Sequence, residues 1–326
     1  MRRTSVRQLV ATAVLGVFPL MLAAACGSSS SSSPPASSGL EKTNLVVGAV
    51  PAETGAAMFI AQERGIFAKH GLHVTVKSIT STTTIVPDML SGAVDIASGQ
   101  IPTFIAAQAH GVGSFHLLAS GLTLGPGVNE ILALKSSGIT TPGQLKGKTL
   151  AVNAPTGDSA LLTDVVLADA GVSPSKVTHK VIPFTDMGVA LSQHEVDAVY
   201  CTEPTCTEIK AKYGAQVIAD TDQGAAQGML TAGYTATTAW MKKYPKTAAA
   251  FTASILEASK IADSNRADLS KALVASLHIT PAVAGSVAIG TFPTSVNQAK
   301  LQQVVNLMVK FGELKGSFNV ASLTKS

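Results

Sequence analysis

Residues 59–74, with the sequence FIAQERGIFAKHGLHV, decide the fold that this chain is expected to adopt. They begin inside an apolar segment, residues 56–64, which predicts a helix that ends at Gly65. A further turn ends at Gly71, because glycine readily takes the left-handed conformation that closes helices. Residues 72–76 then alternate between apolar and polar, which predicts a strand. A helix followed by a strand is the repeating unit of an α/β protein.

The same alternation runs through most of the chain. Helices stand between many of the predicted strands, and Gly111 and Gly171 close two of these helices. After residue 237 the pattern is almost wholly helical. Strands that alternate with helices predict parallel sheets with crossover helices. Strands are expected at residues 44–50, 72–76, 94–97, 115–120, 130–134, 149–152, 177–182, 198–201, 216–219 and 229–235.

A faint internal repeat suggests two lobes. Residues 90–97 and 191–198 each end a helix and enter a strand through Val-Asp, at Asp95 and at Asp197. We expect both carboxylates to bind turn amides rather than to act in catalysis. Two similar α/β units followed by a helical tail predict two lobes, with the tail packed on the first. Ligands of such sheets bind at the carboxyl ends of the strands.

The N-terminal residues predict export. Arg2, Arg3 and Arg7 precede an uncharged apolar run that is too short for a membrane-spanning helix, which needs about 20 residues. Cys26 follows three alanines, and this stretch resembles the bacterial lipobox, in which cleavage leaves a cysteine that carries lipid. We expect a signal peptide at residues 1–25, then the lipidated cysteine and a disordered Ser/Pro-rich linker over residues 26–43. The alternative is an ordinary signal peptide with an incidental cysteine.

Composition indicates a well-packed globular protein, since 46% of the residues are hydrophobic and 13% are charged. Without the three N-terminal arginines, 21 basic residues stand against 20 acidic ones. No basic run or aromatic-interleaved patch is present, so we expect no nucleic-acid partner. Cys201 and Cys206 are candidates for a disulfide in an oxidising compartment, although the sequence leaves their separation in space open. The histidines lack metal-ligand spacing, and we expect no metal and no cofactor.

Several segments together resemble a known family. Residues 59–74 are similar to the "helix, Gly-Phe-Phe, Gly-Leu-x-Val" opening of extracytoplasmic solute-binding proteins of the nitrate/sulfonate/taurine and thiamine-precursor type. The other matching segments are LSGAVDIA at 90–97, SGITTPGQLKGKTLAV at 137–152, VDAVYCTEP at 196–204 and YPK at 244–246. They follow one another in the order of the family and span most of residues 44–263.

The resemblance implies a type II periplasmic-binding-protein fold, in which two α/β lobes joined by two crossovers close like a hinge on a solute. On this basis lobe one comprises residues 44–130 and a helical return at 236–326, and lobe two comprises residues 131–235. The crossovers are then expected near residues 131–134 and 232–236. The implied function is solute capture for an ABC importer by a monomer that is anchored to the outer face of the cell membrane, with a permease and an ATPase as partners.

The predicted cleft loops bear on the ligand. Small hydroxyl residues begin several helices there, which suits an anion but also plain N-capping. The loops contain acidic residues and no Lys or Arg, and Arg64 and Arg266 are expected on helix surfaces. Because a multiply charged anion calls for arginine, we expect a neutral, zwitterionic or weakly cationic organic solute, with Asp158 or Glu53 as partner of a positive group. The candidate ligand-binding residues are Glu53, Thr54, Thr82, Thr83, Gly99, Gln100, Thr156, Gly157, Asp158, Ser159, Phe184, Thr185 and Glu203.

Sulfonate or taurine-like compounds and pyrimidine or thiamine-precursor-like compounds are the solute classes that the resemblance implies. Two other functions remain open. A pyrimidine synthase and a dehydratase use the same fold, but the cysteine-rich run of the synthase family is missing here, and the dehydratases act in the cytoplasm. A ligand-sensing lipoprotein without a transporter also fits the sequence. A permease and an ATPase encoded beside this chain would favour import.

Overall fold

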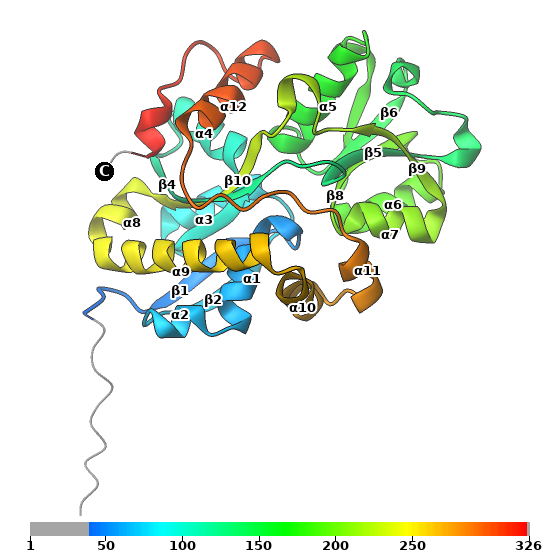
Figure 1. Ribbon diagram of the computed structural model, residues 1–326. Helices are drawn as coiled ribbons and strands as arrows, with labels where there is room; N and C mark the ends of the chain where they lie inside the picture. The colour runs from blue at the N-terminus through cyan, green and yellow to red at the C-terminus, as the bar shows by residue number, and fades with distance from the viewer. Residues whose placement is uncertain (1–38, 325–326) are drawn as a thin grey trace, which may run out of the picture. The chain divides into compact units, whose positions relative to one another are not determined.

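The computed structural model describes residues 39–324 of the chain. The predicted signal peptide, the lipidation site Cys26 and the linker up to residue 38 lie outside the described residues. Within the described part no helix is long and apolar enough to cross a membrane. The described part consists of two α/β lobes and a C-terminal tail (Figure 1).

Lobe one is built on a five-stranded sheet with the order β2-β1-β3-β10-β4. This sheet lies in an apolar core, and strand residues such as Val47 and Ile96 are fully buried in it. Its strands are β1 Asn44–Ala49, β2 His73–Ser78, β3 Ile96–Gln100, β4 Phe115–Thr123 and β10 Leu230–Thr237. Its helices are α1 Ala56–Glu63, α2 Ile66–Lys69, α3 Val86–Ser91 and α4 Ile101–Ala109.

Lobe two repeats this arrangement in a second five-stranded sheet with the order β7-β6-β8-β5-β9. Its strands are β5 Asn129–Leu134, β6 Thr149–Val152, β7 Thr178–Val181, β8 Ala198–Thr202 and β9 Ala215–Asp220. Its helices are α5 Asp158–Asp169, α6 Phe184–Ser192 and α7 Thr205–Tyr213. Short 3-10 helices connect elements of the whole chain: η1 Glu53–Gly55, η2 Thr82–Thr84, η3 Lys135–Ser137, η4 Pro142–Leu145, η5 Pro174–Lys176, η6 Gly224–Ala226 and η7 Val320–Leu323.

Both sheets are mixed, which corrects the expectation of parallel sheets. β10 runs antiparallel to β3 and β4, and β5 runs antiparallel to β8 and β9. The reason is connectivity. β5 enters the lobe-two sheet directly from lobe one, and β10 enters the lobe-one sheet directly from lobe two. The chain changes sheets at residues 124–128 and 221–229, just before these strands rather than within them as expected. The two lobes and their strand order confirm the type II periplasmic-binding-protein fold.

The C-terminal tail returns to lobe one. It contains α8 Thr238–Lys243, α9 Pro245–Ser264, α10 Arg266–Leu277, α11 Pro281–Ser286 and α12 Gln298–Lys310. Helices α9 and α10 pack on α1, and Figure 1 shows α9 on one side of the lobe-one sheet with α4 and α12 on the other. Residues 287–297 are extended rather than helical, which corrects the expectation of an almost wholly helical tail. They bridge to β4 through Thr123 and Thr291, and they bury Phe292.

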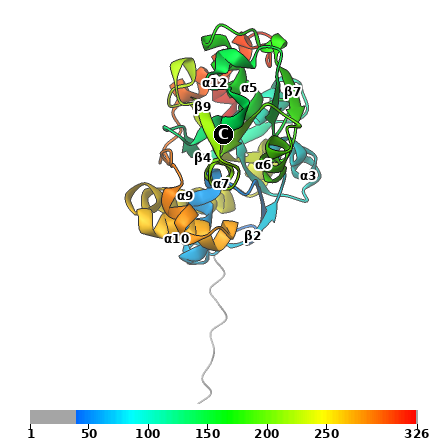
Figure 2. The same cartoon turned by 90° about the vertical axis from the view of Figure 1, so that its right-hand side faces the viewer.

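The stretch that predicted the fold forms α1, α2 and β2. Gly65 and Gly71 have φ angles of 66° and 76°, the left-handed conformation that their positions between the elements require. Phe67 of α2 stacks on Phe251 of α9, with ring centroids 5.6 Å apart. Helices α1 and α2 of this stretch therefore also provide the surface on which α9 and α10 pack. Figure 2 shows α9 and α10 side by side at this end of lobe one.

The two Val-Asp segments have the same structural role. Asp95 accepts a hydrogen bond from the backbone N–H of Val46 at 2.9 Å, and Asp197 accepts one from Thr149 at 2.8 Å. Each carboxylate thus binds an amide of the neighbouring parallel strand. Ahead of β1, the carboxylate of Glu41 accepts hydrogen bonds from the start of α9, at the amide of Thr247 among others. The residues just before β1 are therefore held to the domain, whereas the predicted linker extended to residue 43.

Candidate functional site

A narrow cavity lies between the lobes, where the strands of both sheets end. Lobe one contributes the β1–α1 and β3–α4 connections, and lobe two contributes residues at the ends of β6 and β8 and the start of α5. The free volume is about 30 Å³, room for one or two water molecules. We name it the inner cavity; its lining residues are Val50, Ala52, Thr54, Thr82, Ser98, Gly99, Gln100, Asn129, Asn153, Asp158, Phe184, Tyr200, Thr202, Thr231 and Ala232.

Hydrogen bonds hold the lobes together around this cavity. The hydroxyl of Thr202 in lobe two donates a hydrogen bond to Glu53 Oε1 of lobe one, with the two oxygens 2.7 Å apart. The backbone N–H of Asp158 donates to Gln100 Oε1 at 3.3 Å across the same gap. The N–H of Gly157 donates to Glu313 of the tail at 3.4 Å. The conformation is therefore closed.

Glu53 lies in η1, between β1 and α1, and its side chain is fully buried. Its second carboxylate oxygen, Oε2, has no hydrogen-bond partner among the described residues. Burial raises the pKa of Glu53 to about 8; the hydrogen bond from Thr202 opposes this effect and the nearby Glu203 adds to it. At neutral pH Glu53 therefore carries a proton in this closed form.

Asp158 is the first residue of α5 and is 3% exposed. Its Oδ1 lacks a partner within the described part of the chain. Burial raises its pKa well above the usual range, and the neighbouring Glu313 raises it further. Glu313 itself has a pKa of about 7, chiefly because it is also buried. Burial thus raises the pKa of both carboxyl groups and favours their neutral forms.

Two asparagines at the inner cavity were not among the residues predicted from the sequence. Asn129 begins β5 and Asn153 follows β6, and they are 5% and 6% exposed. Asn129 Oδ1 and both amide atoms of Asn153 have no partner among residues 39–324. Buried polar groups are nearly always hydrogen-bonded in proteins, so these atoms mark a place where a ligand would bind. Their positions at strand ends are the signal that could have identified them.

The structure brings part of the predicted site together. Thr54, Thr82, Gly99, Gln100, Asp158 and Phe184 line the inner cavity. Glu53 and Gly157 adjoin it through the hydrogen bonds across the lobes. Ser159 is buried within α5, and its hydroxyl donates to the carbonyl of Ala154.

The remaining candidates lie outside the cavity lining. Thr83 shares a hydrogen bond with Ser81, and Thr156 and Thr185 are exposed. Glu203 is buried but does not line the inner cavity. Its carboxylate accepts hydrogen bonds from the hydroxyl and the backbone N–H of Thr207, at 2.8 and 3.1 Å. It therefore caps the start of α7.

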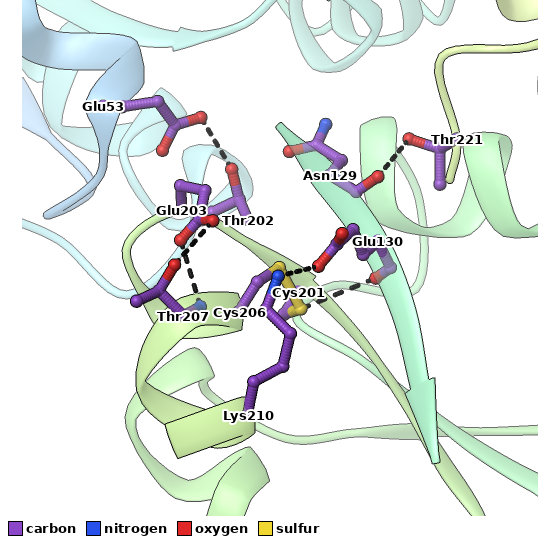
Figure 3. The surroundings of a disulfide bond; sticks show 10 residues. All are labelled: Glu53, Asn129, Glu130, Cys201, Thr202, Glu203, Cys206, Thr207, Lys210 and Thr221. Atoms are coloured by element: carbon purple, nitrogen blue, oxygen red, sulfur yellow. Dashed lines mark hydrogen bonds and ion pairs between the residues drawn. A yellow bond between two sulfur atoms is a disulfide. The ribbon is translucent and has the colours of Figure 1, made fainter. Parts of the chain in front are cut away.

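No Lys or Arg of the described chain lines the inner cavity, and Asp158 is its one ionisable carboxylate. Arg64 pairs with Asp268 on the surface of lobe one, and Arg266 donates to backbone carbonyls at the end of α11. Glu130 pairs with Lys210 of α7 at 2.6 Å, beside the disulfide (Figure 3). Among the described residues no group of three or more His, Cys, Asp or Glu is placed to hold a metal ion.

A disulfide joins Cys201 of β8 to Cys206 of α7, with the Cα atoms 5.3 Å apart. Figure 3 shows it beneath Thr202 and Glu203, the residues that meet Glu53. The peptide bond between Glu203 and Pro204, inside the same short loop, is cis. The disulfide thus closes the loop that presents Thr202 to lobe one.

Two mixed α/β lobes that close on a polar cavity at their strand ends define the class of hinged periplasmic-binding proteins. The chain belongs to the NMT1/THI5-like family, whose family model matches residues 54–265. The bicarbonate transport ATP-binding protein CmpC of Synechocystis is 32% identical over 185 residues, which cover 52% of this chain and 28% of that protein. The chain thus matches little more than a quarter of this curated relative.

Solved structures share the fold at low sequence identity. The alkanesulfonate-binding protein SsuA of Xanthomonas axonopodis pv. citri, bound to MOPS, has a TM-score of 0.74 at 18% identity, covering 87% of this chain and 98% of its own. The nitrate-binding protein NrtA of Synechocystis has a TM-score of 0.75 at 17% identity, over 88% and 87%. The desulfurization enzyme DSZB has a TM-score of 0.66 at 15% identity, over 87% and 96%. Most of the similar structures named are binding proteins, and one is an enzyme.

Proposed function

We propose that this protein is an extracytoplasmic solute-binding protein that captures a small organic solute between its lobes and delivers it to an ABC importer. The observation that carries this proposal is the inner cavity, which is lined by both lobes and contains buried polar atoms without partners. A binding site shared between hinged lobes couples capture of the solute to closure. Membership of the NMT1/THI5-like family and the transport components among its relatives support the same function.

The solute classes that the sequence resemblance implies are sulfonate or taurine-like compounds and pyrimidine or thiamine-precursor-like compounds, and the alkanesulfonate-binding relative SsuA supports the first. We propose Glu53, Gln100, Asp158 and Phe184 as the main candidate contacts, together with Asn129 and Asn153. The closed form leaves little free volume, so a solute of this size enters an open form and the lobes close around it. Two unpartnered amides and a carboxyl provide the small number of fixed polar groups that such sites use for orientation.

For the cellular setting, we propose a monomer that is attached to the outer face of the cell membrane through lipid on Cys26. The Ala-Ala-Cys stretch and the Ser/Pro-rich segment after it support an anchored domain on a tether. Its partners are then a permease and an ATPase. An anchored binding protein stays close to its importer, which raises the effective concentration at the transporter.

We propose binding rather than catalysis. The lining of the inner cavity contains neither histidine nor cysteine, so it lacks the side chains that most often act as general base or thiol nucleophile. The desulfurization enzyme DSZB shows that a chain with this fold can be catalytic. The two functions separate in a single assay, because a binding protein returns its solute unchanged.

Thermal unfolding in the presence of candidate solutes tests the proposal. The screen contains taurine, alkanesulfonates, nitrate, bicarbonate, pyrimidines, thiamine and amino-acid-like zwitterions. A solute at 100 times its dissociation constant adds about 2.7 kcal/mol to the free energy of unfolding, so a true ligand raises the melting temperature clearly. The expected result is a shift with one chemical class and recovery of that compound unaltered. A flat response to every class would count against the binding function.

A further inference from the structure

The inner cavity contains a set of hydrogen-bonding atoms that is biased toward acceptors. Asp158 Oδ1, Asn129 Oδ1 and Asn153 Oδ1 are fully buried acceptor atoms without a partner among the described residues, and Asn153 Nδ2 is the one donor of these side chains that is fully buried without a partner. All three side chains are more than nine-tenths buried and line the cavity.

An acceptor-rich cavity is filled best by a group that donates several hydrogen bonds. A primary ammonium group has three N–H donors and no acceptor. It is close to a water molecule in size, and the cavity has about 30 Å³ of free volume, enough for one or two waters. A sulfonate brings three acceptor oxygens and a negative charge, and within the described lining no Lys or Arg is present to bind it.

A second cavity, which we name the outer chamber, adjoins the inner cavity. Val50 and Phe184 line both of them. The outer chamber has a free volume of about 180 Å³. Its walls combine the apolar side chains of Val50, Pro51, Ile79, Pro183 and Phe184 with the hydroxyl residues Ser78, Thr80, Thr185 and Thr205. Its walls come from both lobes, since Val50 and Ile79 belong to lobe one and Phe184 begins α6 of lobe two. An apolar substituent on the group in the inner cavity would extend past Phe184 into this space.

We propose that the inner cavity binds the primary ammonium group of the solute and that the outer chamber holds a short apolar substituent. This assignment rests on the proposed solute-binding function, and it favours compact organic ammonium compounds over the sulfonates and pyrimidines that the family resemblance implies. Asp158 provides the counter-charge, and Asn129 and Asn153 accept the remaining N–H groups. Phe184 lies where the ammonium group joins the apolar substituent.

The protonation of Asp158 supports the assignment. Burial and the neighbouring Glu313 raise the pKa of Asp158 when the cavity holds no cation. The other titratable groups around it are Tyr200 and Glu53, whose pKa values are also raised by burial. An ammonium ion would favour the ionised carboxylate, so binding would release a proton, and affinity would increase with pH. An anion bound by a protonated carboxyl would show the opposite dependence.

Calorimetric titration of the full-length protein tests the assignment with four probes: n-butylammonium, 1-butanol, butane-1-sulfonate and methylammonium, each at pH 6 and pH 8. We expect n-butylammonium to bind at least tenfold more tightly than 1-butanol, and butane-1-sulfonate not to bind. The affinity for n-butylammonium should rise severalfold from pH 6 to pH 8. Asp158→Asn should lower that affinity at least tenfold and remove its pH dependence, whereas Asp186→Asn, at an exposed acid of α6, should leave both unchanged.

Phe184→Ala separates the two compartments, because it should weaken the binding of n-butylammonium by a larger factor than the binding of methylammonium. A cooperative melting transition near that of the wild type would show that Asp158→Asn is folded, since the amide has the same shape as the buried carboxyl that it replaces. Binding of butane-1-sulfonate in preference to n-butylammonium would overturn the ammonium assignment and keep the solute-binding function. Absence of binding by all four probes, together with a flat thermal screen, would overturn both.

Discussion

The hydroxyl of Thr202, at the end of β8, donates a hydrogen bond to Glu53 Oε1 in the other lobe, with the oxygens 2.7 Å apart. Both side chains are buried, and the backbone N–H of Glu53 approaches the carbonyl of Glu203 at 3.4 Å beside them. Opening of the lobes breaks this pair and returns Glu53 to water. Lobe closure is therefore linked to the protonation of Glu53, as well as to the short disulfide-closed loop that carries Thr202.

Gly157 provides a direct test of closure. Its φ of 92° suits glycine, and a Cβ placed there would lie 2.7 Å from Gln100 Oε1 and 3.0 Å from Thr103 Oγ1, both in lobe one. Gly157→Ala should therefore shift the protein toward an open form. It should also cost about 1–3 kcal/mol of folding stability through backbone strain. Small-angle scattering should show a larger radius of gyration than for the wild type.

The matched control is Gly171→Ala. Gly171 also has a positive φ, 74°, but no atom lies within 4 Å of the added Cβ. This variant should lose stability and keep the wild-type radius of gyration. Adding Gln100→Ala to Gly157→Ala removes the nearest clashing side chain and should restore part of the closure. An unchanged radius in Gly157→Ala would show that the two lobes do not approach each other there in solution.

The stability of the ligand-free protein should fall as the pH rises. A carboxyl whose folded pKa is raised stabilises the folded state at low pH, and this contribution is lost as the pH rises from the usual value of 4.5 through the folded pKa. For Glu53 the folded pKa is about 8. Glu313, at about 7, and Asp164, at about 6, act in the same direction, as do Asp158 and Glu203, whose pKa values are raised by burial.

Glu53→Gln isolates one part of this pH dependence. Glutamine can still accept the hydrogen bond from Thr202 but does not titrate. The free energy of unfolding in urea, measured between pH 5 and pH 8.5, should therefore decline less in the variant. The decline in the free energy of unfolding should differ between the variant and the wild type by on the order of a few kcal/mol, because one pKa unit corresponds to about 1.36 kcal/mol. Parallel declines in the two proteins would show that Glu53 does not titrate in this range.

The sequence predicted the two lobes because alternating elements and strand-to-helix glycines are local patterns. It also located Glu53 and Asp158, since residues after a strand and before a helix face the cleft of such folds. The direction of a side chain is not local, so Glu203 was expected at the ligand although its carboxylate binds Thr207. Asn129 and Asn153 were missed because an amide becomes informative only when packing leaves it buried and unpartnered.

Reduction of the disulfide should destabilise the protein modestly. The loop between Cys201 and Cys206 is short, so the entropy model gives about 2 kcal/mol for the cross-link. For a domain of this size that corresponds to a fall in melting temperature of roughly 4–8 °C. Thermal unfolding with and without dithiothreitol measures it. The double variant Cys201→Ser, Cys206→Ser should melt at the lower temperature and should not respond to dithiothreitol; a response would locate the effect elsewhere.

The two equivalent aspartates of the repeat should differ in their contribution to stability. Asp95 is 3% exposed and accepts hydrogen bonds from Trp240 Nε1 at 2.7 Å and Lys42 Nζ at 2.5 Å, besides the amide of Val46. Asp197 binds one amide, at Thr149, and its side chain is 35% exposed with Lys148 at 3.4 Å.

Asp95→Ala would leave several buried donors without an acceptor, a loss of about 3–5 kcal/mol. Asp197→Ala should cost about 1 kcal/mol, because water can reach the amide that it leaves free. Urea unfolding of the two variants beside the wild type measures the difference. Equal losses would mean that the hydrogen bond from the neighbouring strand's amide, which both aspartates accept, determines their contribution to stability, and that the burial of the network around Asp95 does not.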